Sequence, residues 1–237
     1  APIGTALGQH SGWRITFLAI AGLAAVALAL LVRFVPMRGA TAGSAAAELR
    51  VLRSRDLQLA LALTALGNAG VLMVFTYLAP LLTGVAGFTA AAVPVLLLGY
   101  GLGAALGNLA GGWLSDRALL PSLIGLLAAL AAVLALGGIV GDRQVPAALL
   151  VVATGALAFA IIPGMQTRVL ATAGAAPTLG IALNASGFQI AAAAAAWLGG
   201  RVIDGAGLAA LYPIGALITA AGAALAVLCW RRERRMA

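Results

Sequence analysis

Long apolar runs, separated by short stretches rich in polar residues, glycine or proline, organise this chain. The runs carry no strict alternation of apolar and polar positions, which a membrane β-barrel needs. A helix that crosses the hydrocarbon core of a bilayer needs about 20 mainly apolar residues. The pattern therefore predicts an all-α membrane protein with seven complete transmembrane helices, at 15–32, 57–82, 93–114, 122–140, 147–162, 178–198 and 212–230. Residues 1–9 look like the end of an eighth helix, so the chain reads as an N-terminally truncated fragment.

One long polar stretch interrupts this pattern at 33–56. Its prolines and glycines indicate a linker, and Ser44 is placed to cap a short helix at 45–55 on the membrane surface. We therefore expect three parts: helical segments at 1–33, a linker at 34–56 and a six-helix unit at 57–237. Six helices after a long basic loop correspond to half of a twelve-helix transporter built from two six-helix bundles.

Composition supports a membrane environment. The chain is 63% hydrophobic and only 8% charged, whereas soluble domains carry about 25% charged residues. The net charge of +8 comes from arginines, and their placement follows the predicted topology. Eleven arginines fall on one side of the membrane, and only Arg14, Arg143 and Arg201 fall on the other. The positive-inside rule then places the linker and the C-terminus in the cytoplasm, so the basic charge requires no nucleic-acid partner.

The third predicted span has the most regular pattern. Glycine recurs at every fourth position, at Gly99, Gly103, Gly107 and Gly111. Residues four apart share a helix face, so these glycines form a bare groove that another helix backbone can approach closely. A short polar turn is expected to follow at 115–117, where the charged residues meet the membrane surface.

Polar side chains within the spans are the candidates for a substrate cavity, because polar groups at membrane depth usually face the bundle interior or a water-filled cavity. The alternative is a structural hydrogen bond between helices, worth about 0.6 kcal/mol on average. Asn68, Asn184 and Gln189 are favoured because they lie near the middle of their spans. The full set of candidates is Thr64, Asn68, Tyr77, Tyr100, Asn108, Asn184 and Gln189.

Several stretches, in their order and spacing, resemble the major facilitator superfamily, in particular its bacterial drug, sugar and nucleoside efflux branch. They are Pro2-Ile3-Gly4 with Gly12-Trp13-Arg14, residues 76–82 with Gly87-Phe88, residues 97–117, residues 163–168 and residues 184–188. The resemblance covers nearly the whole chain. It implies that the chain runs from the end of helix five to helix twelve of that fold.

The resemblance also implies a function. It suggests a secondary transporter in the bacterial inner membrane that works by alternating access, as an antiporter exporting a small organic molecule in exchange for protons. Gly112, Asp116 and Arg117 match the family's cytoplasmic Gly-x-x-x-Asp-Arg motif, which helps to lock the two halves together. The motif usually continues with Gly-Arg-Arg, whereas this chain continues with Ala118-Leu119-Leu120. A solute importer of the same fold and a truncated, non-transporting membrane protein are the alternatives.

The sequence shows no motif for catalysis or metal binding, and no acidic residue within the membrane spans. No span has an acidic residue near its centre, so a proton-carrying carboxylate is expected in a first half that the fragment lacks. His10 and Cys229 stand alone, without the companions of a metal site. No nucleophile–base pair or phosphate loop is present. We therefore expect no enzyme activity, no cofactor and no metal. The resemblance to the superfamily implies a small molecule and protons as partners, and a monomer as the full-length protein.

Overall fold

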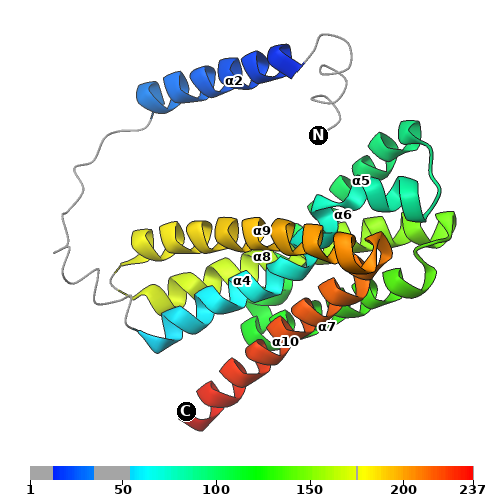
Figure 1. The fold of residues 1–237 in the computed structure, drawn as a ribbon. Coiled ribbons are helices and arrows are strands. Elements are labelled where there is room, and N and C mark those ends of the chain that lie inside the picture. Colours follow the sequence, from blue (N-terminus) through cyan, green and yellow to red (C-terminus); the bar gives the residue numbers. More distant parts are fainter. Residues whose placement is uncertain (1–12, 35–53, 175, 237) are drawn as a thin grey trace. The chain divides into compact units, whose positions relative to one another are not determined.

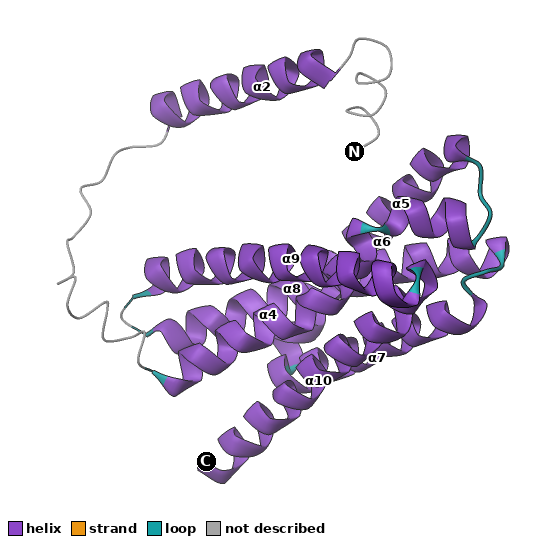
Figure 2. Cartoon of the chain, in the orientation of Figure 1, coloured by secondary structure: helices purple, strands orange, loops and turns teal. Residues whose placement is uncertain are grey.

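The computed structural model describes residues 13–34, 54–174 and 176–236. Figure 2 shows helices throughout these ranges, joined by short loops, and no strand occurs in them. The main helices are α2 (Trp13–Phe34), α4 (Arg55–Thr76), α6 (Val93–Arg117), α7 (Leu119–Val140), α8 (Gln144–Ala173), α9 (Pro177–Ala206) and α10 (Leu211–Met236). Short pieces complete the fold: α5 (Leu78–Pro80), a π-helix η1 (Leu81–Val85) and the 3₁₀ turns η2 (Ala90–Ala92) and η3 (Leu208–Ala210).

Seven helices in the described ranges are long and apolar enough to cross a membrane. This confirms the predicted fold class. The chain divides into two compact units, Ala1–Ala45 and Ala46–Ala237. The first contains α2, and the second contains a bundle of the other helices (Figure 1). The predicted eighth-helix end at 1–9, the helix capped by Ser44 and nearly all of the linker at 34–56 lie outside the described residues, so the proposed division into three parts remains a prediction.

Several helices extend beyond their predicted ends. The expected turn at 115–117 is the last turn of α6, which ends at Arg117. The fifth span was predicted to stop at Pro163, but α8 continues through this proline to Ala173. The sixth was predicted to stop before Gly199, yet α9 continues to Ala206. A proline or glycine is tolerated in membrane helices because neighbouring helices, polar side chains and local adjustments of the helix satisfy the backbone groups that it frees.

The second predicted span contains a helix that ends earlier than expected. It was expected as one helix over 57–82, but α4 ends at Thr76. Tyr77 forms the break, and the chain continues through α5 into the π-helix η1. The main-chain N–H of Leu81 donates to the carbonyl of Tyr77 at 3.0 Å, so the backbone stays largely hydrogen-bonded across the break.

The core of the bundle lies around one face of α7. Leucines at intervals of three and four residues are all buried there against α8, α10 and α4: Leu120, Leu123, Leu127, Leu130 and Leu134. Lipid chains are as apolar as leucine, so burial of these side chains gains little from the hydrophobic effect in a membrane. Close van der Waals packing supplies the attraction instead.

The predicted glycine groove lies against α8. A Cβ atom added at Gly103, Gly107 or Gly111 would overlap backbone atoms of Val152, Ala156 or Ala160, respectively. These three α8 residues also recur at every fourth position, so the two helices meet at regular intervals along their length. Gly99, at the start of the row, is looser, because its added Cβ would lie 3.2 Å from a Val152 side-chain methyl.

A second glycine-lined contact joins α4 to α10. A Cβ atom on Gly70 would overlap the carbonyl oxygen of Gly215, and one on Gly222 would lie 2.8 Å from the Cα atom of Gly67. The sequence analysis did not identify this contact, because the glycines of each helix are spaced too irregularly to form a visible row.

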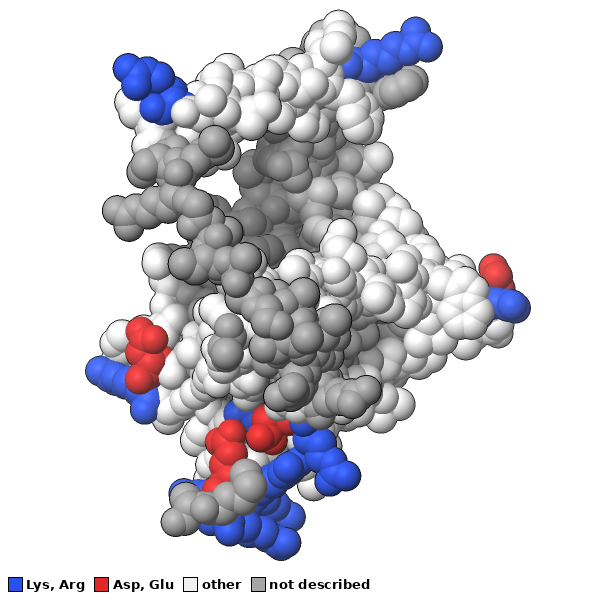
Figure 3. Space-filling model, turned by 90° about the vertical axis from the view of Figure 1, so that its left-hand side faces the viewer, with Lys and Arg blue, Asp and Glu red and all other residues white. Residues whose placement is uncertain are grey.

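Charged side chains tie together the ends of α4, α8 and α10. Arg168 is buried, and its Nη1 donates to Glu233 Oε1 at 2.7 Å. Arg232 lies 3.7 Å from the carboxylate of Asp56, at the more exposed edge of the group. On the face drawn in Figure 3, acidic side chains lie beside arginines, and most of the surface of the described residues in this view carries no charge. This distribution fits a bundle whose middle is surrounded by lipid.

Candidate functional site

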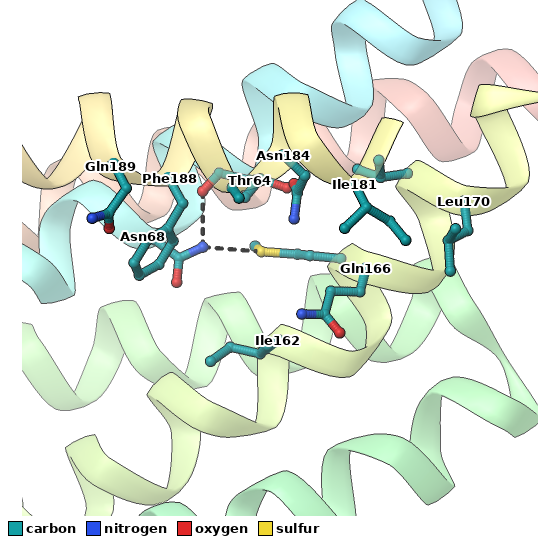
Figure 4. Close-up of a pocket in the computed structure, with 12 residues that line it drawn as sticks. Thr64, Asn68, Ile162, Gln166, Leu170, Ile181, Asn184, Phe188 and Gln189 are labelled. Carbon is teal, nitrogen blue, oxygen red and sulfur yellow. Dashed lines mark hydrogen bonds between the residues drawn. The ribbon is translucent and has the colours of Figure 1, made fainter. Parts of the chain in front are cut away.

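A pocket of about 410 Å³ lies between α4, α8 and α9 within the described bundle. Its walls mix apolar side chains with uncharged amides and one hydroxyl, as Figure 4 shows. Helix α4 contributes two residues, α8 five and α9 five: Thr64, Asn68, Ile162, Met165, Gln166, Val169, Leu170, Ile181, Asn184, Ala185, Phe188 and Gln189. The pocket size is typical of small-molecule sites.

Four of the residues predicted to face a cavity line this pocket: Thr64, Asn68, Asn184 and Gln189. They belong to spans that are distant in sequence, and the packing of α4 beside α8 and α9 brings them together. Thr64 and Asn68 lie one turn apart on α4, as predicted, and both are buried. The other two extend from successive turns of α9 (Figure 4).

Asn68 connects the two sides of the pocket wall. Its Nδ2 donates to the main-chain carbonyl of Thr64 at 2.8 Å and to the sulfur of Met165 on α8 at 3.2 Å. The hydroxyl of Thr64 in turn donates to the carbonyl of Ala60 at 3.2 Å. Both N–H groups of the Asn68 amide and the Thr64 hydroxyl hydrogen are therefore used within the protein.

The remaining amides are less constrained. Oδ1 of Asn184 is buried and accepts no hydrogen bond from any described residue. Gln166 on α8 and Asn184 on α9 extend into the same space from opposite sides (Figure 4). The sequence analysis missed Gln166 and Met165, because it ended the fifth span at residue 162, just before Pro163. Continuation of the apolar pattern past the proline, at Val169 and Leu170, was the signal that could have identified them.

Three other predicted cavity residues lie outside this pocket. Tyr77 is half-buried, and its hydroxyl donates to the Ala196 carbonyl at 2.8 Å. Tyr100 is buried between aromatic rings, with centroid distances of 4.9 Å to Phe75 and 6.4 Å to Phe159. Asn108 is exposed on α6. The two tyrosines thus pack helices together, and Asn108 faces away from the bundle.

The residues of the Gly-x-x-x-Asp-Arg motif lie at the end of α6. A Cβ atom on Gly112 would meet no atom within 4 Å, and Asp116 is exposed. Within the described ranges Asp116 forms no ion pair, while the Arg117 guanidinium lies 3.4 Å from the centre of the Trp113 ring. The motif therefore presents a glycine and a carboxylate on an open surface of this bundle.

Among the residues that the structure describes, no group of three or more His, Cys, Asp or Glu side chains could hold a metal ion. The acidic residues of the bundle lie at or near helix ends, in line with the sequence pattern: Asp56, Asp116, Asp142, Asp204 and Glu233.

Comparison with known proteins gives the chain a family. The family model described as Major Facilitator Superfamily matches residues 1–178. An uncharacterized MFS-type transporter of Bacillus subtilis, YtbD, is 35% identical over 92% of this chain and 56% of its own length. The inner membrane transport protein YdhP of Escherichia coli is 32% identical over 98% of this chain and 60% of its own length. A chloramphenicol resistance protein of Streptomyces lividans is 35% identical over 81% of this chain and 50% of its own length.

The chain thus spans about three fifths or less of these relatives. Three quarters of it match the family model, and the fold is the helical membrane bundle that the resemblance implied. The chain belongs to the major facilitator superfamily of membrane transporters.

Proposed function

We propose that the chain forms part of a secondary transporter that exports a small organic molecule by alternating access. The observation that carries the proposal is the pocket between α4, α8 and α9. It lies on membrane-spanning helices and combines apolar walls with uncharged polar groups, which is the composition expected of a small-molecule site. The resistance named for the Streptomyces lividans relative supports export of a drug-like compound.

In this proposal, residues 57–237 form the C-terminal six-helix half and residues 1–33 the end of the N-terminal half. Two such halves rock around a central site in alternating access. Gly112, Asp116 and Arg117 contact the other half on the cytoplasmic side. The exposure of Asp116, with no ion-pair partner among the described residues, supports this role.

Proton coupling requires a titratable group in the transport pathway. None of the residues that line the described pocket is acidic or basic. We therefore place the coupling carboxylate outside this pocket, in the N-terminal half. The upstream reading frame tests this arrangement. About five further spans, of about 20 residues each plus loops, are expected there, and a stop codon immediately upstream of Ala1 would contradict it.

Accumulation of chloramphenicol in cells tests the transport function. Cells that express the full-length gene should accumulate less of the compound than control cells, and a protonophore should abolish the difference. An increase in accumulation would support the importer of the same fold instead. Equal accumulation with a panel of drugs, sugars and nucleosides would support a non-transporting membrane protein.

The orientation is tested by cysteine labelling with a reagent that cannot cross the membrane. The excess of arginines on one side places residues 34–56 and the C-terminus in the cytoplasm. A cysteine introduced at Thr89, an exposed residue of the loop between η1 and η2, should react in intact cells, and one at Ala42 only after lysis. The native Cys229 is buried and should contribute little background. The reverse labelling pattern would overturn the orientation.

A further inference from the structure

The end of α10 carries a run of charged residues directly after its apolar part. The apolar part runs from Leu211 to Trp230 and is about 30 Å long at 1.5 Å per residue, which matches the thickness of the hydrocarbon core of a bilayer. Tryptophan is enriched where a helix leaves that core. Residues 231–235, Arg-Arg-Glu-Arg-Arg, are therefore placed at the level of the lipid headgroups.

Two of these five residues are used inside the bundle. Glu233 accepts a hydrogen bond from the buried Arg168 of α8 at 2.7 Å, and Arg232 lies 3.7 Å from the carboxylate of Asp56 at the start of α4. These contacts fix the side of α10 that faces its neighbours at this end. Each contact joins one arginine to one carboxylate, so neither contributes a net charge.

The other three arginines share the opposite side of the helix. With 3.6 residues per turn, Arg231, Arg234 and Arg235 fall within about 100° of one another, and Glu233 falls outside this face. All three are exposed, and none forms an ion pair or hydrogen bond with another residue that the structure describes. The guanidinium of Arg234 lies 4.2 Å from the centre of the Trp230 ring, a cation–π contact that holds it beside the interfacial tryptophan.

Positive charge is in excess around this face. Like charges one turn apart repel each other, so three adjacent free arginines favour a negatively charged partner. In the described residues where α4, α8 and α10 meet, two carboxylates accompany six arginines: Arg55, Arg168, Arg231, Arg232, Arg234 and Arg235. The largest group of arginines in Figure 3 lies at the lower end of the view, the end at which the C-terminus lies in Figure 1.

An apolar surface leads to these arginines along α10. Its exposed positions include one stripe at intervals of four and three residues: Leu217, Ala221, Ala224, Leu228, Arg231 and Arg235. Leu228 is 61% exposed and lies one turn before Arg231. The stripe is therefore apolar at membrane depth and basic at the membrane surface.

A phospholipid has the same division into an apolar and a charged part. A guanidinium can donate two parallel hydrogen bonds to a phosphate group. Residues three and four apart on a helix lie about 5–6 Å from each other, close enough to share one headgroup. Free phosphate offers the same hydrogen bonds, but only a lipid also places acyl chains against the apolar stripe.

We propose that Arg231, Arg234 and Arg235 bind the headgroup phosphate of an anionic phospholipid, whose acyl chains lie along the exposed stripe of α10. Arg232 and Glu233 hold the helix against α4 and α8, so the three free arginines stay turned toward the lipid. This inference does not depend on the transported molecule, on the direction of transport or on the side of the membrane at which the helix ends.

Native mass spectrometry of the full-length protein in detergent tests the site, because it resolves individual bound lipids. The probes are phosphatidylglycerol, phosphatidylcholine with the same acyl chains, and inorganic phosphate. The wild-type protein should bind its first phosphatidylglycerol about 100-fold more tightly than phosphatidylcholine. This estimate takes about fivefold for each of three arginines, the factor for about 1 kcal/mol. Inorganic phosphate should not displace the lipid.

Two double variants locate the effect. Arg231→Gln with Arg235→Gln should weaken phosphatidylglycerol binding about 25-fold, by the same factor per arginine. Arg143→Gln with Arg201→Gln is the charge-matched control, because it removes two exposed arginines at the other end of the bundle. This control should bind the lipid normally. Arg231→Lys with Arg235→Lys keeps both charges and should retain most of the affinity, because lysine also binds phosphate.

Four results would overturn the proposal. Equal affinity of the wild-type protein for the two lipids would do so without any variant. Unchanged phosphatidylglycerol binding by the Arg231→Gln, Arg235→Gln protein would exclude the site. An equal loss in the charge-matched control would show a general effect of net charge. Displacement of the lipid by inorganic phosphate would assign the arginines to free phosphate instead. Melting temperatures in lipid-free detergent should be the same for wild type and glutamine variant, which separates lost binding from lost fold.

Discussion

The contact between α6 and α8 yields the most direct test of the fold. Replacing Gly107 by alanine adds one methyl group where the two backbones meet. The added Cβ would overlap the Ala156 carbonyl oxygen and lie 2.6 Å from its carbon, whereas ordinary van der Waals contact begins at 3.4 Å. The obstacle is main chain, which cannot rotate away as a side chain can. The helices must therefore separate along the row of contacts.

The size of the effect can be bounded. Separating packed atoms by 0.5–1 Å forfeits about a quarter to a half of their dispersion energy. Overpacking a tight interior costs about 1–3 kcal/mol, and a backbone obstacle places Gly107→Ala near 3 kcal/mol. Alanine also stabilises a helix relative to glycine by about 1 kcal/mol. Gly101→Ala is the matched control, because it makes the same change on α6 where no atom lies within 4 Å of the added Cβ.

Thermal unfolding of the purified full-length protein in detergent measures the difference. In soluble proteins of 150–250 residues, 1 kcal/mol shifts Tm by about 2–4 °C, and the shift is smaller in a longer chain. Because the full-length protein is longer than this, Gly107→Ala should melt a few degrees, and at most about 6 °C, below Gly101→Ala. The helix-propensity gain cancels in this comparison. Equal melting temperatures for the two variants would show that α6 and α8 do not meet at Gly107, and the reasoning from the glycine row would fail.

Three further predictions concern the remaining contacts of the bundle, and all can be measured in the same thermal assay. Gly70→Ala should lower Tm through overlap with α10, while Gly125→Ala, in open space on α7, should not; equal shifts would refute the α4–α10 contact. Glu233→Gln leaves the buried Arg168 without its carboxylate and should cost about 1 kcal/mol, because solvent already screens the half-exposed Glu233; raised salt should shrink the difference. Tyr77→Phe removes one hydrogen bond to α9 and should also cost about 1 kcal/mol; an unchanged Tm would mean that the bond is not formed.

The positions of the membrane helices could be predicted from sequence because lipid imposes a strong constraint. A spanning segment must be apolar over its whole length and must satisfy its own backbone. Each predicted span coincides with a long helix, apart from the break at Tyr77 in the second. The glycine row of α6 was equally visible, since a strict interval of four fixes one helix face without any knowledge of the partner.

Helix ends were harder to predict, for a related reason. Glycine and proline end helices in water, where the freed backbone groups bond to solvent. In α8 and α9 the chain passes through such residues, and each helix reaches 30 residues. Treating Pro163 as a terminator removed Gln166 and Met165 from the list of pocket residues. The error in the helix end therefore became an error in the site.

Helix α8 shows why a packing surface leaves a clearer signal in the sequence than a pocket surface. Before Pro163 it meets α6 through Val152, Ala156 and Ala160, which repeat at every fourth position. From Ile162 onward it faces the pocket with residues of different sizes and polarities. Packing requires close approach of the two backbones at regular intervals, which the glycines of α6 permit, so the requirement leaves a periodic signal in the sequence. A binding wall requires particular groups at points fixed by three helices at once. Its residues follow no period within any one helix, and they can be identified only when the helices are assembled.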